Sequence, residues 1–205
     1  KEFEINKLDL ASSRMSSTPL NTSNVAEATY QVGYLEDTTL INGFAATTGT
    51  YDVKGLFQTG KASGNYDTTG YDWGTATNIP ICIQAAHTLL LADNIQPPYN
   101  YTVNPAQWNQ AFEFIGTTAV TYQDWLQKTT QGGSVYVTPA ITAGTMMITS
   151  ANPEGKFEYV ISEDLTTQTE TTSIKDGENL FGRVYVRGLP VVYDANWICA
   201  IDDIT

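Results

Sequence analysis

The sequence changes its hydrophobic period at Gly132-Gly133, and this change constrains the fold more than any other feature. Before the two glycines, apolar residues recur at helical spacing, most clearly over residues 24–43 and 79–93. After them, apolar and polar residues alternate, which is the pattern of half-buried β-strands. Helices that precede a run of antiparallel strands, and do not alternate with them, predict an α+β fold.

Four helices are expected in the chain. The longest spans residues 24–43, with Asn24 as N-cap, Glu27 at the capping-box position and Gly43 as its stop. It is apolar on two sides and therefore needs partners on both. One stripe comprises Val25, Ala28, Val32 and Leu35, and the other comprises Tyr30, Tyr34 and Ile41.

The other three helices are shorter and carry start signals of their own. Residues 79–93 have Pro80 in the first turn and the helically spaced Ile81, Ala85, Leu89 and Leu90. Asn104-Pro105 opens a helix over residues 106–115, and a fourth covers 121–129. Residues 44–78 show no useful period and predict a long ordered loop, with short strands around 51–57.

The expected strands alternate apolar and polar residues and are separated by turn residues. Asp176-Gly177 is a hairpin signal between two of them. The predicted strands are residues 1–10, 99–103, 134–138, 144–149, 156–161, 164–173, 180–188 and 197–204.

The charge balance argues against direct binding of nucleic acid. The chain has 22 acidic and 10 basic residues, a net charge of −12, so its averaged field repels a polyanion. Arg183 and Arg187 are the closest arginines, and acids flank them. A protein container can still enclose DNA without binding it. Only 16% of the residues are charged, against about 25% in a typical domain, which suits dense contact between copies.

No catalytic, cofactor-binding or metal-binding residue is predicted, and no cofactor. Cys82 and Cys199 each lie among apolar residues and are read as buried free thiols. His87, the single histidine, is read as a core or interface residue, and one histidine cannot form a two-His zinc site. The adjacent acids Glu36-Asp37, Glu163-Asp164 and Asp202-Asp203 point apart and predict solvated or intersubunit faces.

Three further features leave alternatives open. Four Trp and 12 Tyr keep a carbohydrate-binding surface possible, and Asn21 and Asn100 match the glycosylation pattern. No apolar run has the length of a membrane span and no signal peptide is visible, so no membrane partner is expected. The sequence starts at Lys1 without an initiator Met, which implies processing, trimming or a partial chain.

Four colinear stretches give the sequence a family resemblance. It resembles the major capsid proteins of tailed phages, the Hong Kong 97-type fold, and the related encapsulin shell proteins. The first stretch joins Leu10-Ala-Ser-Ser-Arg14, Thr18-Pro-Leu-Asn-Thr22, Ala26-Glu-Ala28 and Glu36-Asp-Thr-Thr-Leu-Ile-Asn-Gly43. The others are Gly55-Leu-Phe57 with Asp72-Trp73, then Tyr101-Thr-Val-Asn-Pro-Ala-Gln-Trp108, then the closing strands around Gly144–Ile148, Phe157–Leu165 and Val184–Val192.

This resemblance implies a peripheral domain of residues 1–76 and 163–192, in which a long spine helix lies on antiparallel strands. It implies an axial α+β domain of residues 77–162 and 193–205 around fivefold or sixfold axes. The N-terminal arm and most of the extended loop of the family are missing from this sequence.

The implied function is a structural, non-enzymatic shell subunit that self-assembles into an icosahedral virus or provirus capsid. Its partners would be copies of itself in pentamers and hexamers, and an enclosed genome or cargo protein held without strong nucleic-acid binding. Such a chain is expected in a virion, or in the cytoplasm as an assembled particle. One alternative is an encapsulin nanocompartment that encloses a cargo enzyme, and a second is a secreted carbohydrate-binding or surface module.

Overall fold

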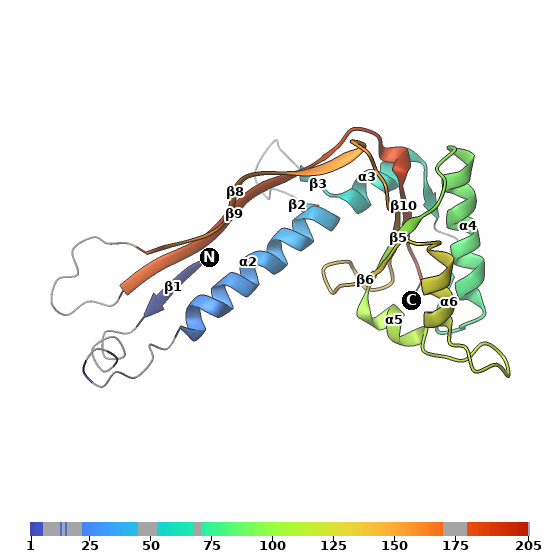
Figure 1. Ribbon diagram of the computed structural model, residues 1–205, viewed down its shortest axis with the longest axis horizontal. Coiled ribbons are helices and arrows are strands. Elements are labelled where there is room, and N and C mark those ends of the chain that lie inside the picture. Colours follow the sequence, from blue (N-terminus) through green and yellow to red (C-terminus); the bar gives the residue numbers. More distant parts are fainter. Residues whose placement is uncertain are drawn as a thin grey trace. The chain divides into compact units, whose positions relative to one another are not determined.

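The computed structural model describes residues 1–5, 13, 15, 22–44, 53–67, 71–169 and 180–204. The chain divides into two compact units. Unit 1 comprises Lys1–Asp37 and Val160–Leu189, and unit 2 comprises Thr38–Tyr159 and Pro190–Thr205. Helices and mostly antiparallel strands occur together, so the predicted α+β class is confirmed (Figure 1).

Unit 1 consists of one helix on a three-stranded sheet. The strand order is β1 (Glu2–Ile5), β9 (Leu180–Val192), β8 (Phe157–Thr169), with β1 antiparallel to β9. Helix α2 (Ser23–Asn42) covers one face of this sheet up to the end of the unit at Asp37. The core between helix and sheet contains Phe3, Ile5, Ala28, Val32 and Val184. The predicted long helix on antiparallel strands is therefore present.

The start of α2 differs from the prediction. The helix begins at Ser23, and the backbone N–H groups of Val25 and Ala26 donate to the carbonyl of Thr22. Asn24 is not the N-cap, because it lies inside the helix, which already begins at Ser23. Its side-chain amide nitrogen donates to the carbonyl of Glu4 on β1, at 2.8 Å, and so connects the first turn of α2 to the neighbouring strand.

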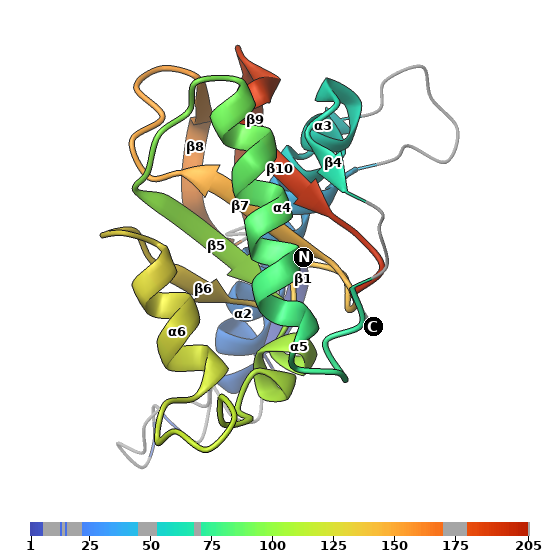
Figure 2. The same cartoon turned by 90° about the vertical axis from the view of Figure 1, so that its right-hand side faces the viewer.

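Unit 2 is built on a five-stranded mixed sheet (Figure 2). The order is β4 (Tyr66–Asp67), β10 (Ile198–Ile201), β7 (Met146–Ser150), β5 (Tyr99–Val103) and β6 (Val135–Val137). The pairs β4–β10 and β5–β6 are parallel, and the other two pairs are antiparallel. A separate two-stranded sheet pairs β2 (Gly43–Phe44) with β3 (Val53–Lys54).

Helices bury both faces of the five-stranded sheet. Helices α4 (Asn78–Ala92), α5 (Pro105–Gln110) and α6 (Tyr122–Thr129) contribute to the larger core, with Cys199, Ile201 and Ile148 of the sheet. Helix α3 (Leu56–Ser63) contributes to the smaller core, with Ile198, Ala200 and Met147. Because side chains alternate along a strand, β7 and β10 send one residue to each core in turn, and every residue of both strands is buried.

The loop predicted over residues 44–78 is wrong, but β3 lies in the part around 51–57 where short strands were expected. This segment contains α3 together with β2, β3 and β4. Gly60 allows α3 to lie close to β10, since a Cβ at this position would be 2.9 Å from Cγ2 of Ile198. Close packing against β10 at this glycine thus stabilises α3. Glycine itself is a poor helix former, so the sequence pattern did not predict the helix.

Two other element boundaries also differ. The helix expected over 106–115 ends at Gln110, because the chain turns at Ala111 and its carbonyl accepts from the N–H of Gln123. The strands expected at 156–161 and 164–173 form one strand, β8. The short helix η1 (Ala195–Trp197) precedes β10.

The predicted cap of α5 is confirmed, because Asn104 Oδ1 accepts from the N–H of Ala106 with Pro105 in the first turn. Helix α6 begins with a capping box of Thr121 and Asp124, which was not predicted.

Several predictions lie outside the described residues. They are the strand beyond Ile5, the turn at Asp176-Gly177, the motifs between Leu10 and Asn21, and Asn21 itself. The assignment of a peripheral domain to 1–76 and 163–192, and of an axial domain to 77–162 and 193–205, stays a prediction. The contacts group residues 38–76 with unit 2.

Candidate assembly surfaces

The two cysteines lie in one core and are not poised to react. Cys82 on α4 and Cys199 on β10 are buried free thiols in the larger core of unit 2. Burial raises the pKa of each thiol to about 12. Because the thiolate is the nucleophile and the metal ligand, neither group is activated near neutral pH.

The single histidine belongs to a chain of hydrogen bonds inside unit 2. His87 Nε2 lies 2.8 Å from the hydroxyl of Tyr101, which is fully buried on β5. The same hydroxyl lies 3.2 Å from Oγ1 of Thr129 on α6, and Thr129 donates to the carbonyl of Leu126. Burial lowers the pKa of His87. His87 is therefore half-buried and hydrogen-bonded, and whether it is the predicted core residue or an interface residue stays open.

The adjacent acids pair with bases and tyrosines of their own unit. Glu163 in unit 1 accepts from Tyr185 at 2.6 Å and lies 3.4 Å from Nε of Arg187. Asp202 in unit 2 accepts from Lys61 at 2.9 Å and from Tyr66 at 2.8 Å. Among the described residues, no three His, Cys, Asp or Glu side chains cluster as metal ligands would. Glu163 thus connects β8 to β9, and Asp202 connects the end of β10 to α3 and β4.

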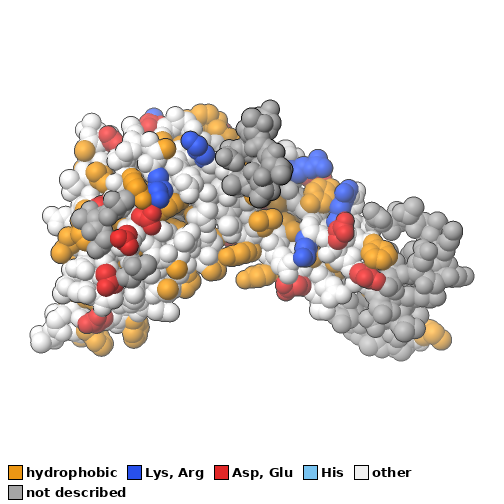
Figure 3. Space-filling view, turned by 180° about the vertical axis from the view of Figure 1, so that it is seen from behind, with side chains coloured by type: hydrophobic (Ala, Val, Ile, Leu, Met, Phe, Trp, Pro, Cys, Tyr) orange, Lys and Arg blue, Asp and Glu red, His pale blue; other side chains and the backbone are white. Residues whose placement is uncertain are grey.

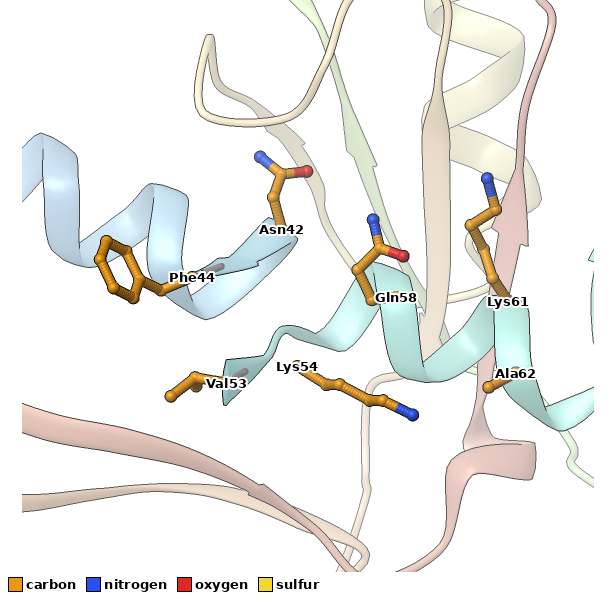
Figure 4. Close-up of a pocket in the computed structure, with 7 residues that line it drawn as sticks. All are labelled: Asn42, Phe44, Val53, Lys54, Gln58, Lys61 and Ala62. Carbon is orange, nitrogen blue, oxygen red and sulfur yellow. The ribbon is translucent and has the colours of Figure 1, made fainter. Parts of the chain in front are cut away.

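One open pocket of about 490 Å³ lies beside α3 in unit 2 (Figure 4). Phe44, Val53 and Ala62 contribute apolar surface, and Lys54 and Lys61 contribute ammonium groups. The described lining offers no carboxylate, thiol or imidazole, and Lys61 is held by Asp202 outside it. The pocket therefore lacks the convergent acid and base that a hydrolytic or transfer reaction requires.

The face seen in Figure 3 carries hydrophobic side chains dispersed over the surface, with Lys, Arg, Asp and Glu side chains scattered between them. Exposed large apolar residues occur on helices, strands and loops of both units. Single exposed apolar residues are common on protein surfaces, so the informative sites are those where several lie on one element.

In unit 1, both layers expose apolar and aromatic groups. Tyr30 and Leu35 on α2 are 68% and 59% exposed, so Leu35 does not join the buried stripe that the sequence predicted. On β9, Tyr185 lies between two arginines, with the guanidinium carbons of Arg183 and Arg187 at 5.3 Å and 5.6 Å from its ring. Phe181 and Leu189 are exposed on the same strand.

In unit 2, the outer side of α4 is the most distinctive surface. The helix contains no acidic residue, no Lys and no Arg over its 15 residues. Leu90 and Ile83 are buried against the sheet, whereas Ile81 and Leu91 are 51% and 45% exposed. Solvated helices normally carry charges on the outer side, so this face resembles one that a neighbouring protein covers.

Two smaller apolar sites accompany α4 in unit 2. The turn between α5 and α6 exposes Phe112 and Phe114, and β6 exposes Tyr136 and Val137 at the edge of the sheet. The sequence did not mark these residues, because single apolar residues in a loop or a short strand carry no period. None of the described helices has the length and apolarity needed to cross a membrane.

Solved structures share the fold of this chain. It aligns with the virus-like particle from Pyrococcus furiosus at a TM-score of 0.71 and 15% identity, covering 98% of this chain and 75% of that chain. The capsid of Myoviridae phage XM1 aligns at 0.69 and 12% identity, with 98% and 71% covered. A chain of Mycobacterium phage Ogopogo aligns at 0.69 and 12% identity, with 98% and 73% covered.

Sequence comparison adds a family to this shared fold. No curated protein sequence matches the chain. The model of the family described as an encapsulating protein for peroxidase, Linocin_M18, matches residues 1–175. The resemblance to encapsulin shell proteins and the Hong Kong 97-type fold are thus both confirmed, and the chain belongs to the Linocin_M18 family of encapsulating proteins.

Proposed function

We propose that this chain is a structural subunit that self-assembles into the icosahedral shell of a virus or provirus capsid. The observation that carries the proposal is the family match over residues 1–175, together with a fold shared with capsid and virus-like-particle chains. The weakly charged surfaces of both units support the same function. We find no arrangement of groups in the described residues that supports catalysis better.

Assembly of this kind acts through many moderate contacts. A surface of one copy that meets a different surface of the next copy produces a ring or a closed shell when the rotation closes. The uncharged face of α4 and the exposed Phe112 and Phe114 are suited to such contacts. A subunit in a closed shell leaves only when several contacts break together, which makes the shell far more stable than one interface.

The second candidate is an encapsulin-type compartment that encloses a cargo enzyme. The description of the matching family, an encapsulating protein for peroxidase, favours it. The two candidates share the subunit function and differ in what the shell contains. In either case, the excess of acidic over basic residues disfavours binding of phosphate groups. This supports a shell that encloses its content without binding nucleic acid strongly.

The remaining aspects of the proposal follow from a mechanical role. The subunit performs no reaction and needs no cofactor, and its partners are its own copies and the enclosed content. It resides in a virion or in an assembled particle in the cytoplasm. A secreted carbohydrate-binding module is less well supported, because neither the family match nor the shared fold points to one.

Electron microscopy and size-exclusion chromatography of the full-length protein from its natural gene test the proposal. We expect closed particles of uniform diameter. Nucleic acid in particles from the native host identifies a capsid, and a co-purified folded enzyme identifies a cargo compartment. A protein that stays monomeric under all assembly conditions, or that binds a glycan array while monomeric, contradicts the shell function.

A further inference from the structure

The hydrogen bonds around His87 join three elements of unit 2. His87 lies on α4, Tyr101 on β5, and Thr129 on α6, and their polar atoms form a continuous chain with steps of 2.8 Å and 3.2 Å. The chain ends at the carbonyl of Leu126, 2.8 Å from Oγ1 of Thr129. Through this chain of hydrogen bonds, the His87 side chain of α4 is connected to both the sheet and a second helix.

The donors and acceptors in this chain fix its direction. A carbonyl oxygen only accepts, so Thr129 uses its one hydroxyl hydrogen on Leu126. Tyr101 must then donate its own hydrogen to Thr129. The oxygen of Tyr101 is left to accept from His87, which requires a hydrogen on Nε2. Neutral His87 is therefore the Nε2–H tautomer, and Nδ1 is the nitrogen that takes up a further proton.

The described surroundings of His87 contain two aromatic rings but place no carboxylate against the imidazole. The ring of Tyr99 lies 4.6 Å from the imidazole, centroid to centroid, and that of Tyr101 lies 6.0 Å away. Helix α4 itself has no charged residue, and burial is the cause of the lowered pKa of His87. The titratable groups on the elements packed against α4 are Tyr99 and Tyr101 on β5, Cys199 on β10, Tyr66 and Asp67 on β4, and Tyr122 with the exposed Asp124 and Lys128 on α6.

We propose that His87 makes unit 2 acid-labile, because uptake of one proton at Nδ1 places an uncompensated charge where α4, β5 and α6 meet. The hydrogen bond from Nε2 to Tyr101 persists when Nδ1 is protonated, so the destabilisation comes from the half-buried charge itself, which loosens α4 from the sheet. The proposal concerns the fold of the subunit and does not depend on what a shell of such subunits contains.

The direction of the pH effect follows from the pKa. His87 has a lower pKa in the folded chain than the ordinary value of about 6.5. Its contribution to stability is therefore fully present above pH 6.5 and is lost as the pH falls toward the folded pKa. One pH unit below the ordinary value, at pH 5.5, the unfolding equilibrium constant rises by up to about tenfold from this group alone.

Hydrogen exchange of the full chain and of its His87→Gln variant tests the proposal. Gln retains a side-chain N–H donor but does not titrate. Between pH 7.5 and 5.5, after correction for intrinsic exchange, the opening equilibrium constant of α4 and β5 should rise by up to about tenfold in the wild type. It should stay nearly constant in the variant. The same rise in both chains overturns the proposal.

A second measurement needs no substitution. Because the sequence holds one histidine, ¹⁵N-histidine labelling of the tag-free chain gives a single imidazole to observe, in solution or in an assembled particle. We expect the Nε2–H tautomer at pH 7.5 and protonation of Nδ1 at a pH below 6.5. An Nδ1–H tautomer, or a titration midpoint above 6.5, overturns the proposal even if the Gln variant does not fold.

A matched pair of tyrosine variants separates this chain of bonds from ordinary burial. Tyr99 and Tyr101 lie two residues apart on β5 and are both fully buried, but only Tyr101 bonds to His87, while Tyr99 donates to the carbonyl of Ile95. Tyr101→Phe should change the ¹⁵N shift of Nε2, since that N–H loses its acceptor. Tyr99→Phe should leave this shift in place, and equal shifts in both variants contradict the assigned bond.

Discussion

The ring of Phe3 on β1 lies directly over Gly182, its cross-strand partner on β9. A Cβ built on Gly182 would also lie 2.9 Å from the carbonyl oxygen of Gln168 on β8. Glycine at this position therefore lets an aromatic side chain fill the space between the sheet and α2. The core of unit 1 therefore requires a residue without a side chain at position 182.

Gly182→Ala should lower the free energy of unfolding by about 1–3 kcal/mol, the usual cost of forcing an extra methyl group into a packed core. Denaturant unfolding of the full chain measures this change. Adding Phe3→Leu to the variant should recover part of the loss, because the smaller side chain gives room to the methyl group. A Gly182→Ala chain as stable as the wild type contradicts the described packing.

Gly33→Ala should have the opposite effect in the same unit. Gly33 lies inside α2, and a Cβ at this position meets no atom within 4 Å. Alanine there raises helix propensity and restricts the unfolded chain, so the free energy of unfolding should rise by about 0.5–1 kcal/mol. Thermal unfolding of the two glycine variants side by side checks the sign of each effect.

Asp202→Asn should remove stability that depends on pH. Burial acts to raise the pKa of Asp202, but hydrogen bonds from Lys61 and Tyr66 outweigh it and hold the pKa below its ordinary 3.8. The contribution is thus present above about pH 4 and is lost as the pH falls through the lowered folded pKa. We expect a loss of about 0.5–1 kcal/mol at pH 7 that vanishes in strong acid.

The measurement for Asp202 is the difference in unfolding free energy from the wild type between pH 7 and pH 2. Asp203→Asn provides the matched control, since Asp203 is the adjacent, exposed carboxylate. A variant at Asp203 with the same pH-dependent loss would show that total charge, and not the bond to Lys61, causes the effect.

Charges on the outer face of α4 should block assembly without unfolding the subunit. Ile81→Glu and Leu91→Glu place a carboxylate on two exposed positions of a helix that has none. If a neighbouring copy covers this face, each buried and unpaired charge should reduce particle yield at least tenfold. Gln127→Glu, on the exposed side of α6, is the control. Circular dichroism confirms the fold, and particle yield is measured by microscopy.

The elements that the sequence predicted well are those with strong periods or explicit caps. Helix α2, α4, α6 and the central strands β5 and β7 lie close to their expected positions. Asn104 caps as predicted, with Oδ1 accepting from Ala106 while its amide nitrogen donates to the carbonyl of Ile141. Asn24 does not cap, because α2 begins one residue earlier, at Ser23, and the side chain of Asn24 bonds to Glu4 on β1.

The elements that the sequence missed depend on tertiary contacts. Helix α3 is short and has a glycine in its middle, so only its packing against Ile198 reveals why it is helical. The exposed side of α4 could not be assigned either. This helix is apolar nearly all round, and Ile81, one of its helically spaced apolar residues, is on the outside. The surfaces proposed for assembly follow from exposure in the fold and not from periodicity.

The pairing of β1 with β9 and of β4 with β10 has a consequence for how each copy matures. Glu2 pairs with Arg183, and Tyr66 pairs with Ala200, so both sheets join segments separated by well over 100 positions. Native pairings of such long range form slowly and late. Neither sheet is complete in a nascent chain until its distant partner strand has emerged. Folding of one polypeptide should therefore finish before it docks onto others, and until then the unpaired strand edges remain open to wrong partners.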